Sequence, residues 1–229
     1  MRLLGVLGGM SWTSTEAYYR ALNTQVAGRL GGLHSARLLL HSVDFDGIAE
    51  RQHSGDWPGT AEILAEAARG LAAGGAEGLL LATNTMHKVA PEIEAASGLE
   101  LLHIADATAA AVRAAGLGRV GLLATAFTME DTFYVGRLAA HGVEALVPPA
   151  AQRAEVHRII YDELVLDVVR DESRAVYRRV MADLVDAGSE GLILGCTEIG
   201  LLVGSGDTTV EVFDSTVIHV AAAVEWILG

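Results

Sequence analysis

The segment Gly75-Ala76-Glu77-Gly78-Leu79-Leu80-Leu81-Ala82-Thr83 matches Gly188-Ser189-Glu190-Gly191-Leu192-Ile193-Leu194-Gly195-Cys196 without a gap. Each copy is a short apolar run that opens into a small or polar residue, a pattern typical of a buried strand followed by a turn. The copies begin at residues 75 and 188, about half of the 229-residue chain apart. Two copies of one α/β unit are the simplest explanation.

A second match supports this duplication at a similar offset. The start Arg2-Leu3-Leu4-Gly5-Val6-Leu7-Gly8 resembles Arg119-Val120-Gly121-Leu122-Leu123-Ala124-Thr125. Chance is the alternative, because Ala, Gly and Leu are abundant at strand-to-helix junctions in this chain. If the duplication is real, the carboxyl-end loops of two similar sheets converge where open α/β sheets bind ligands. Thr83 and Cys196 then occupy equivalent places on opposite walls.

Apolar runs alternate with amphipathic stretches along the whole chain, beginning with a helix from Thr13 to about Arg29. The predicted strands are Leu3–Leu7, Ala36–His41, Gly78–Leu81, Leu101–Ile104, Val120–Leu123, Val143–Leu146, Leu192–Leu194 and Val210–Phe213. We therefore predict an α/β fold of two pseudo-symmetric lobes, each a parallel sheet flanked by helices, with the active site at their interface. Residues 1–104 and 210–229 form the first lobe, and residues 105–209 form the second. The last helix, Ser215–Leu228, packs on the first lobe.

Composition excludes several classes of protein. The net charge is −13 and no basic stripe appears, which argues against nucleic acid as a partner. No apolar run is long enough to span a membrane, and the N-terminal run is too short for a signal peptide. A single cysteine excludes an intramolecular disulfide and favours a reducing cytoplasm. We expect a cytoplasmic protein that acts on a small molecule.

No cofactor or metal is predicted. Lys88 is the only lysine, and no glycine-rich phosphate cradle with a basic partner accompanies it, so pyridoxal phosphate chemistry is disfavoured. Gly8-Gly9-Met10-Ser11 follows the first strand, where glycine lets the backbone approach a ligand closely, but the dinucleotide fingerprint is incomplete. The eight histidines show no metal-binding spacing.

Cys196 follows a predicted strand and precedes Thr197-Glu198, so we expect it at the start of a helix. Unpaired amide groups and the helix dipole favour a thiolate there, which could act as a base near neutral pH. A buried structural cysteine is the alternative, since free cysteines are among the most buried residues. The strand-end position and the polar neighbours favour the reactive interpretation.

Two further turns carry polar side chains. Thr83-Asn84-Thr85 ends the matching strand of the first half and can hold a carboxylate, although helix capping explains such residues equally well. Thr125 and Thr128 follow the strand Val120–Leu123 and place two hydroxyls where a substrate side chain could be recognised. A tight turn without a function is the alternative there.

Three motifs occur together in order: Leu7-Gly8-Gly9-Met10-Ser11-Trp12, Thr83-Asn84-Thr85-Met86-His87 and Gly195-Cys196-Thr197-Glu198-Ile199. The chain resembles the aspartate/glutamate racemase family over essentially its whole length. The resemblance implies amino-acid racemisation without a cofactor, in which one residue removes the α-proton and another returns a proton to the opposite face. It also implies a homodimer.

Most relatives use two cysteines, whereas this chain has Thr83 where the first cysteine is expected. A threonine hydroxyl is too weak an acid to rest as an alkoxide. Thr83 would thus deliver a proton through water, which gives a racemase biased toward the L-enantiomer. The alternatives are a single-cysteine decarboxylase or isomerase of the same superfamily and a binding protein without catalysis.

The resemblance also implies roles for the remaining site residues. Asn84, Thr85 and Thr197 would hold the α-carboxylate. Met10, Gln52, Thr125 and Thr128 would border the substrate side chain. Many aspartate-specific relatives have a lysine at the position of Val165, so its absence leaves open a broader range of amino acids.

Overall fold

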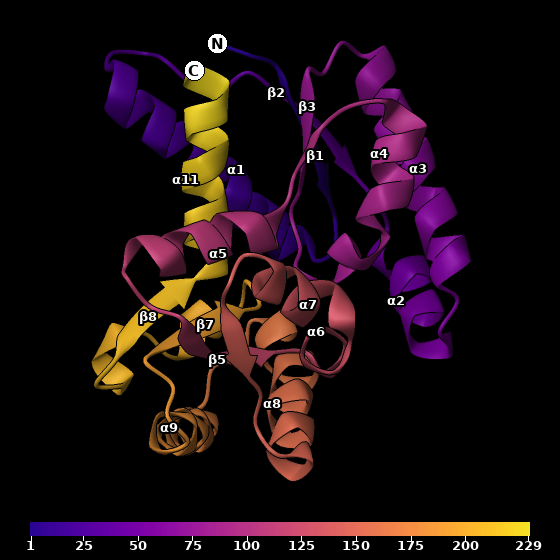
Figure 1. Ribbon diagram of the computed structural model, residues 1–229. Helices are drawn as coiled ribbons and strands as arrows, with labels where there is room; N and C mark the ends of the chain where they lie inside the picture. The colour runs from indigo at the N-terminus through magenta and orange to yellow at the C-terminus, as the bar shows by residue number, and fades with distance from the viewer. The chain divides into compact units, whose positions relative to one another are not determined.

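The computed structural model describes residues 1–229, and the chain forms two compact units (Figure 1). Unit 1 contains Met1–His103 and His219–Gly229, and unit 2 contains Ile104–Ile218. No helix is long and apolar enough to cross a membrane.

A four-stranded parallel sheet forms the centre of unit 1. Its strands are β1 (Leu4–Gly8), β2 (Leu38–Ser42), β3 (Gly78–Leu81) and β4 (Leu101–Leu102), in the order β2-β1-β3-β4. The helical elements of unit 1 are α1 (Trp12–Leu30), α2 (Phe45–Ser54), α3 (Trp57–Ala73), the 3₁₀ turn η1 (Thr85–Val89), α4 (Ala90–Ser97) and most of α11 (Ser215–Leu228).

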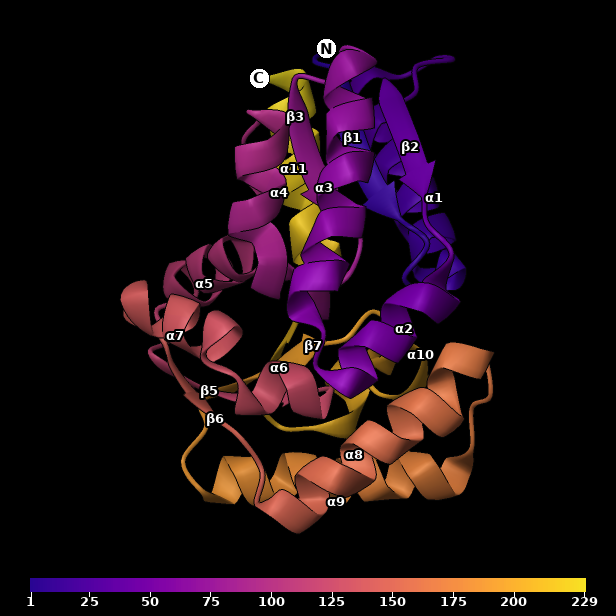
Figure 2. The ribbon, with the colours of Figure 1, turned by 90° about the vertical axis from the view of Figure 1, so that its right-hand side faces the viewer.

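Alternate residues of these strands face opposite helix layers. Leu7, Leu79 and Leu81 share an apolar core with Leu64 of α3 and Ile93 of α4. On the other face, the strand residues Leu4, Val6 and Leu80 pack with α1 and α11 through a second group of side chains: Tyr18, Leu22, Val26, Val220, Val224 and Ile227. Figure 2 shows α3 and α4 on one side of the sheet and α11 on the other. A sheet covered on both faces explains the continuous apolar runs in the sequence.

Gly78 marks a close approach of α11 to the sheet. A Cβ atom at this position would lie 2.4 Å from Cζ2 of Trp226. We therefore expect Gly78→Ala to lower the free energy of unfolding by about 1–3 kcal/mol, the usual cost of overpacking. Gly70→Ala is the matched control, because no atom lies within 4 Å of its added Cβ in α3. That substitution should leave stability unchanged or raise it by up to about 1 kcal/mol. Equal urea midpoints for the two variants would contradict this account.

Unit 2 repeats the plan of unit 1. Its parallel strands are β5 (Arg119–Ala124), β6 (Glu144–Leu146), β7 (Gly191–Gly195) and β8 (Glu211–Asp214), in the order β6-β5-β7-β8. The helical elements are α5 (Ile104–Ala114), α6 (Ala126–Glu130), α7 (Thr132–Ala140), α8 (Ala150–Asp162), η2 (Leu164–Leu166), α9 (Asp171–Asp186), α10 (Ile199–Leu202) and η3 (Ser205–Asp207). The two sheets share one strand order, as the predicted duplication requires.

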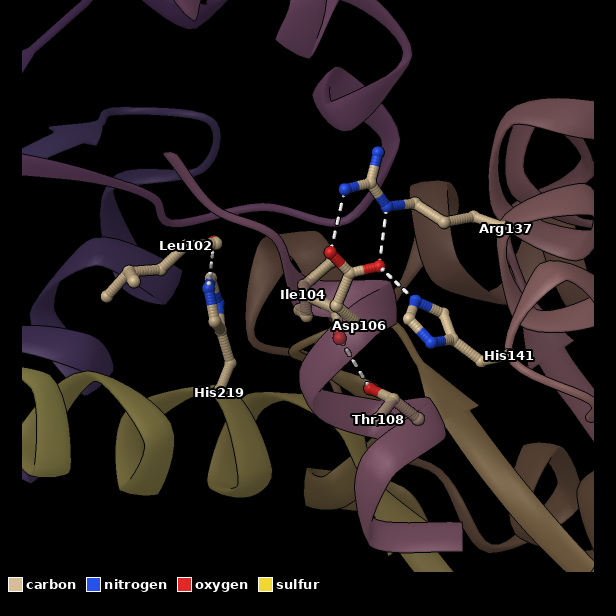
Figure 3. Close-up of polar contacts among 7 residues, drawn as sticks. All are labelled: Leu102, Ile104, Asp106, Thr108, Arg137, His141 and His219. Atoms are coloured by element: carbon tan, nitrogen blue, oxygen red, sulfur yellow. Dashed lines mark hydrogen bonds and ion pairs between the residues drawn. The ribbon is translucent and has the colours of Figure 1, made fainter. Parts of the chain in front are cut away.

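An ion group joins α5 to α7 within unit 2 (Figure 3). The carboxylate of Asp106 accepts two hydrogen bonds from Arg137, at 2.6 and 2.7 Å, and contacts His141 Nε2 at 2.9 Å. All three side chains are at least one-third exposed, so solvent screens the charges. The group orients two helices and makes only a small contribution to stability.

The predicted second boundary between the lobes is wrong. The sequence prediction places residues 210–218 in the first lobe, but β8 pairs with β7 in unit 2, with Leu192 opposite Val212. The division falls inside α11, between Ile218 and His219. From His219 onward α11 packs on the sheet of unit 1, as predicted. The expected strand Leu101–Ile104 also ends early, because α5 already begins at Ile104.

Candidate active site

Cys196 lies directly after β7, at the carboxyl edge of the sheet of unit 2. Its side chain belongs to the core of that unit and is 9% exposed. The Sγ–H group donates a hydrogen bond to Oε2 of Glu198 at 3.1 Å. The hydroxyl of Thr197 contacts the same carboxylate oxygen. A buried carboxylate therefore faces the only thiol in the chain.

The expectation of a thiolate at a helix start is wrong. The following helix, α10, begins only at Ile199 and contains four residues, so little helix dipole is available. Burial raises the pKa of the Cys196 thiol well above its ordinary value, and the negative charges of Glu198 and Asp214 act in the same direction. A hydrogen bond to the Glu198 backbone has a smaller opposite effect. At neutral pH Cys196 therefore carries its proton.

Glu198 was not among the predicted site residues, yet the structure places it against Cys196. It lies two residues after the cysteine, its side chain is buried, and it can accept the thiol proton directly. The signal was available, because a carboxylate close to a reactive thiol can serve as its base. The local sequence alone did not show that the turn folds the carboxylate back onto Sγ.

Thr125 follows the neighbouring strand of unit 2, β5, and Thr128 lies in α6, the helix that begins there. Both are buried, and their hydroxyl oxygens are 3.3 Å apart. The backbone N–H of Ala126 donates to Nδ1 of His157 at 3.1 Å, which fixes the start of α6. The structure thus brings the two predicted hydroxyls together. They follow β5, which pairs with β7, the strand that precedes Cys196.

Thr83, Asn84 and Thr85 follow β3 in unit 1, and all three are buried. Asn84 is the residue before η1 but its side chain makes no capping hydrogen bond. The hydroxyl of Ser14 donates to the carbonyl of Ala82 at 3.1 Å and ties α1 to the end of the strand. Helix capping, the alternative explanation for this cluster, does not account for the Asn84 side chain.

Gln52 is a buried amide in α2 that lacks any partner. Its side chain is 2% exposed, and neither Nε2 nor Oε1 makes a hydrogen bond. Leaving such groups unsatisfied costs on the order of 1–3 kcal/mol each. A folded chain tolerates this cost most readily where a ligand supplies the missing partners. Gln52 is therefore the residue of unit 1 best suited to bind a polar substrate group.

The glycine turn after β1 serves the fold. Gly9 has φ of +95°, and a Cβ atom there would lie 2.1 Å from the carbonyl oxygen of Val43. The close approach is thus to the backbone after β2, where Val43 N–H also donates to the carbonyl of Gly8 at 3.0 Å. Met10 is buried in the same apolar core as Ile48 of α2. These residues shape the loop in which Met10 lies.

No group of three or more His, Cys, Asp and Glu side chains is arranged to hold a metal ion in the structure.

The predicted site residues fall into two sets, each at the carboxyl edge of one sheet or on a neighbouring helix. Unit 1 contributes Met10, Gln52, Thr83, Asn84 and Thr85. Unit 2 contributes Thr125, Thr128, Cys196 and Thr197, to which the structure adds Glu198.

Comparison with known proteins identifies the family. Residues 7–223 match the family described as Asp/Glu/hydantoin racemase. A crystal structure of a candidate Asp/Glu racemase from Yersinia pestis is 51% identical, with a TM-score of 0.95, and the match covers 100% of both chains. A crystal structure of an aspartate racemase homologue from Pyrococcus horikoshii is 31% identical, with a TM-score of 0.85 and the same full coverage.

A curated relative has a more limited match. The glutamate racemase of Deinococcus radiodurans is 31% identical over 158 residues, which cover 64% of this chain and 52% of that protein. The chain thus aligns with about half the length of this relative.

Proposed function

Because this chain belongs to the Asp/Glu/hydantoin racemase family, we propose that it interconverts the enantiomers of aspartate, glutamate or a related amino acid without a cofactor. The contact between the buried thiol of Cys196 and the carboxylate of Glu198 carries this proposal. A protonated thiol cannot remove a proton, but a thiol with an adjacent carboxylate can transfer its proton and become a thiolate during the reaction.

The first step breaks the Cα–H bond of the L-enantiomer. Glu198 accepts the proton of Cys196, and the thiolate removes the α-proton, so that an S–H bond forms again. The electron pair of the Cα–H bond delocalises into the substrate carboxylate. Hydrogen bonds from the side chains of Asn84, Thr85 and Thr197 to that carboxylate stabilise the developing charge.

The second step adds a proton to the opposite face of Cα. Thr83 acts here through a bound water, because its hydroxyl cannot itself rest as an alkoxide. The water donates a proton to Cα, the hydroxide that remains takes a proton from the solvent, and Glu198 releases its proton to the solvent. The product is the D-enantiomer, and the thiol of Cys196 is ready for the next cycle.

Substrate preference follows from Gln52. Its unpartnered Nε2–H groups would donate to the side-chain carboxylate of aspartate or glutamate, and Met10, Thr125 and Thr128 would border that group. Val165, within η2, supplies no charge. An amide recognises a carboxylate with less charge selectivity than a lysine, so we expect related amino acids to be accepted as well.

The reactions that start from the L- and from the D-enantiomer should differ in kcat and in KM, although not in kcat/KM. Enantiomers have equal free energy in water, so kcat/KM must be the same from either side. Cys196 is a competent base on the L side, whereas Thr83 and water form a weak base on the D side. We therefore expect a higher kcat and a higher KM with the L-enantiomer than with the D-enantiomer.

Thr83→Cys tests this asymmetry. The new thiol supplies a base on the D side, so kcat from D-glutamate should rise by about tenfold or more, because a positioned base contributes about 10²–10⁴-fold. The ratio of the two kcat values should move toward one. Chiral chromatography of reactions started from each enantiomer measures both values. Thr83→Ser, which keeps the hydroxyl, is the control, and an unchanged kcat ratio in Thr83→Cys would contradict the role of Thr83.

The proposal as a whole is tested with the unmodified chain and both enantiomers of aspartate and glutamate. Formation of the opposite enantiomer supports it. Carbon dioxide release from a substituted malonate, without racemisation, would favour the single-cysteine decarboxylase instead. Binding without any reaction of an amino acid would favour a non-catalytic binding protein.

A further inference from the structure

His87 is a buried imidazole whose hydrogen bonds point back to the turn after β3. It lies in η1 and is 2% exposed. Its Nδ1 lies 3.3 Å from the carbonyl oxygen of Asn84, and the ring also hydrogen-bonds to the backbone of Thr83. A carbonyl oxygen only accepts, so Nδ1 must carry the ring proton. His87 is therefore hydrogen-bonded to the backbone of two predicted site residues, and its Nδ1–H donates to the carbonyl of Asn84.

Two other histidines hold this ring in place within unit 1. The rings of His103 and His219 have centroids 4.5 and 5.7 Å from that of His87. The orientation of His219 is fixed from both sides, because its Nε2–H donates to the carbonyl of Leu102 at 2.7 Å and its Nδ1 accepts from Tyr18 at 3.0 Å. Figure 3 shows His219 of α11 reaching the Leu102 carbonyl.

The ring of His87 is neutral in this environment. Burial lowers its pKa well below the ordinary value, and the neighbouring His103 and His219 lower it further. Burial also lowers the pKa of His219, to about 4. Near neutral pH His87 and His219 thus carry no charge, and the role of His87 depends on the geometry of its Nδ1–H.

We propose that His87 is a positioning residue for racemisation, which holds the Thr83–Asn84 backbone so that the Thr83 side chain directs a water to Cα. This inference rests on the proposed function. It assigns His87 to the second step, in which the opposite face is protonated. The first step, at Cys196, uses this turn only through the contact of Asn84 with the substrate carboxylate, so it depends less on His87.

The two steps can be separated in heavy water. The thiol proton of Cys196 exchanges with the heavy water, so its return to Cα places deuterium in the remaining L-glutamate, while delivery at Thr83 produces D-glutamate. Loss of the His87 donor should lower the rate of inversion by about tenfold, because a small misplacement of a catalytic group is costly. Exchange into L-glutamate should fall by no more than about twofold, because it needs only the contact of Asn84 with the carboxylate and not a water placed by Thr83. General loss of structure would lower both rates together.

Three variants make a matched set. The side-chain N–H of asparagine lies close to the place of Nδ1 and that of glutamine close to the place of Nε2, so His87→Asn keeps the donor while His87→Gln and His87→Leu remove it. We expect His87→Asn to keep the wild-type ratio of inversion to exchange, and the other two to lower it about fivefold or more. An unchanged ratio in His87→Gln and His87→Leu, or equal loss of both rates in all three variants, would overturn the inference.

Two structural measurements keep this test independent of the proposed function. The ¹⁵N chemical shifts of the wild-type His87 ring should show a protonated Nδ1 and an unprotonated Nε2. Amide hydrogen exchange of residues 83–89 should be faster in His87→Gln than in His87→Asn. A wild-type chain that neither exchanges nor inverts any amino acid refutes the racemase, whereas an unprotonated Nδ1 refutes the positioning role even if the variants do not fold.

Discussion

Replacing Cys196 with serine is expected to lower α-proton exchange from L-glutamate by about 10³-fold or more, because a positioned base contributes about 10²–10⁴-fold and the chain has no second thiol. Serine has nearly the same volume and can donate to Glu198 in place of the thiol. Its hydroxyl, however, is a far weaker acid, so transfer of its proton to the carboxylate is strongly unfavourable. The measurement is the loss of the Cα proton signal of L-glutamate in heavy water.

The serine variant separates chemistry from packing. Cys196 lies in the apolar core of unit 2, so an alanine would also leave a small cavity. The serine variant should keep a thermal midpoint within a few degrees of the wild type. Retained exchange in a folded Cys196→Ser protein would contradict the thiol mechanism.

Replacing Glu198 with glutamine is expected to lower exchange by about 10²-fold at neutral pH, since the thiol then loses its proton acceptor. The substitution also removes a negative charge beside Sγ, so the pKa of Cys196 falls, although burial still holds it above the ordinary value. Below that pKa the thiolate fraction grows tenfold with each pH unit. Exchange by Glu198→Gln should therefore rise steadily with pH, whereas the wild type, which moves the proton within the pair, should show a flatter profile.

Two controls give this prediction its specificity. Glu198→Asp keeps a carboxylate and should recover part of the lost rate. Asp214→Asn removes the other charge that raises the pKa of Cys196, while its amide oxygen can still accept from the N–H groups of Thr216 and Val217. It should keep exchange within a fewfold of the wild type. A loss in Asp214→Asn as large as that in Glu198→Gln would show that local charge, and not proton transfer to Glu198, sets the rate.

The central strands were predictable because β1, β3 and β7 are buried along their whole length. Runs such as Gly78–Leu81 are apolar throughout, and each was placed to within a few residues of the observed element. The sheet to which a strand belongs could not be predicted from such a run. An apolar run such as Val210–Phe213 indicates a strand, but only hydrogen bonding to β7 places it in unit 2. The boundary between the two units inside α11 also depends on contacts in the folded chain, so hydrophobic periodicity could not predict it.

The prediction of the site residues rested mostly on the order of the three motifs along the chain. Thr83 and Cys196 follow equivalent strands, β3 and β7, which the internal match indicates directly. The ionisation of Cys196 could not be predicted, because it depends on burial and on the fold of the Glu198 side chain toward Sγ. His87 was missed for another reason: the rings that pack against it come from positions 103 and 219, far away in the sequence.

The central claim is that Cys196 acts as the base on the L side and Thr83, through water, supplies the proton on the D side. The most direct test follows unmodified protein with L-glutamate in heavy water and measures the deuterium at Cα of both enantiomers over time. The account predicts that D-glutamate forms with deuterium at Cα from the earliest times, and that the remaining L-glutamate also gains deuterium. D-glutamate that retains the original α-hydrogen would show transfer by a single group and would contradict the account, as would the absence of deuterium from both enantiomers of every acidic amino acid tested.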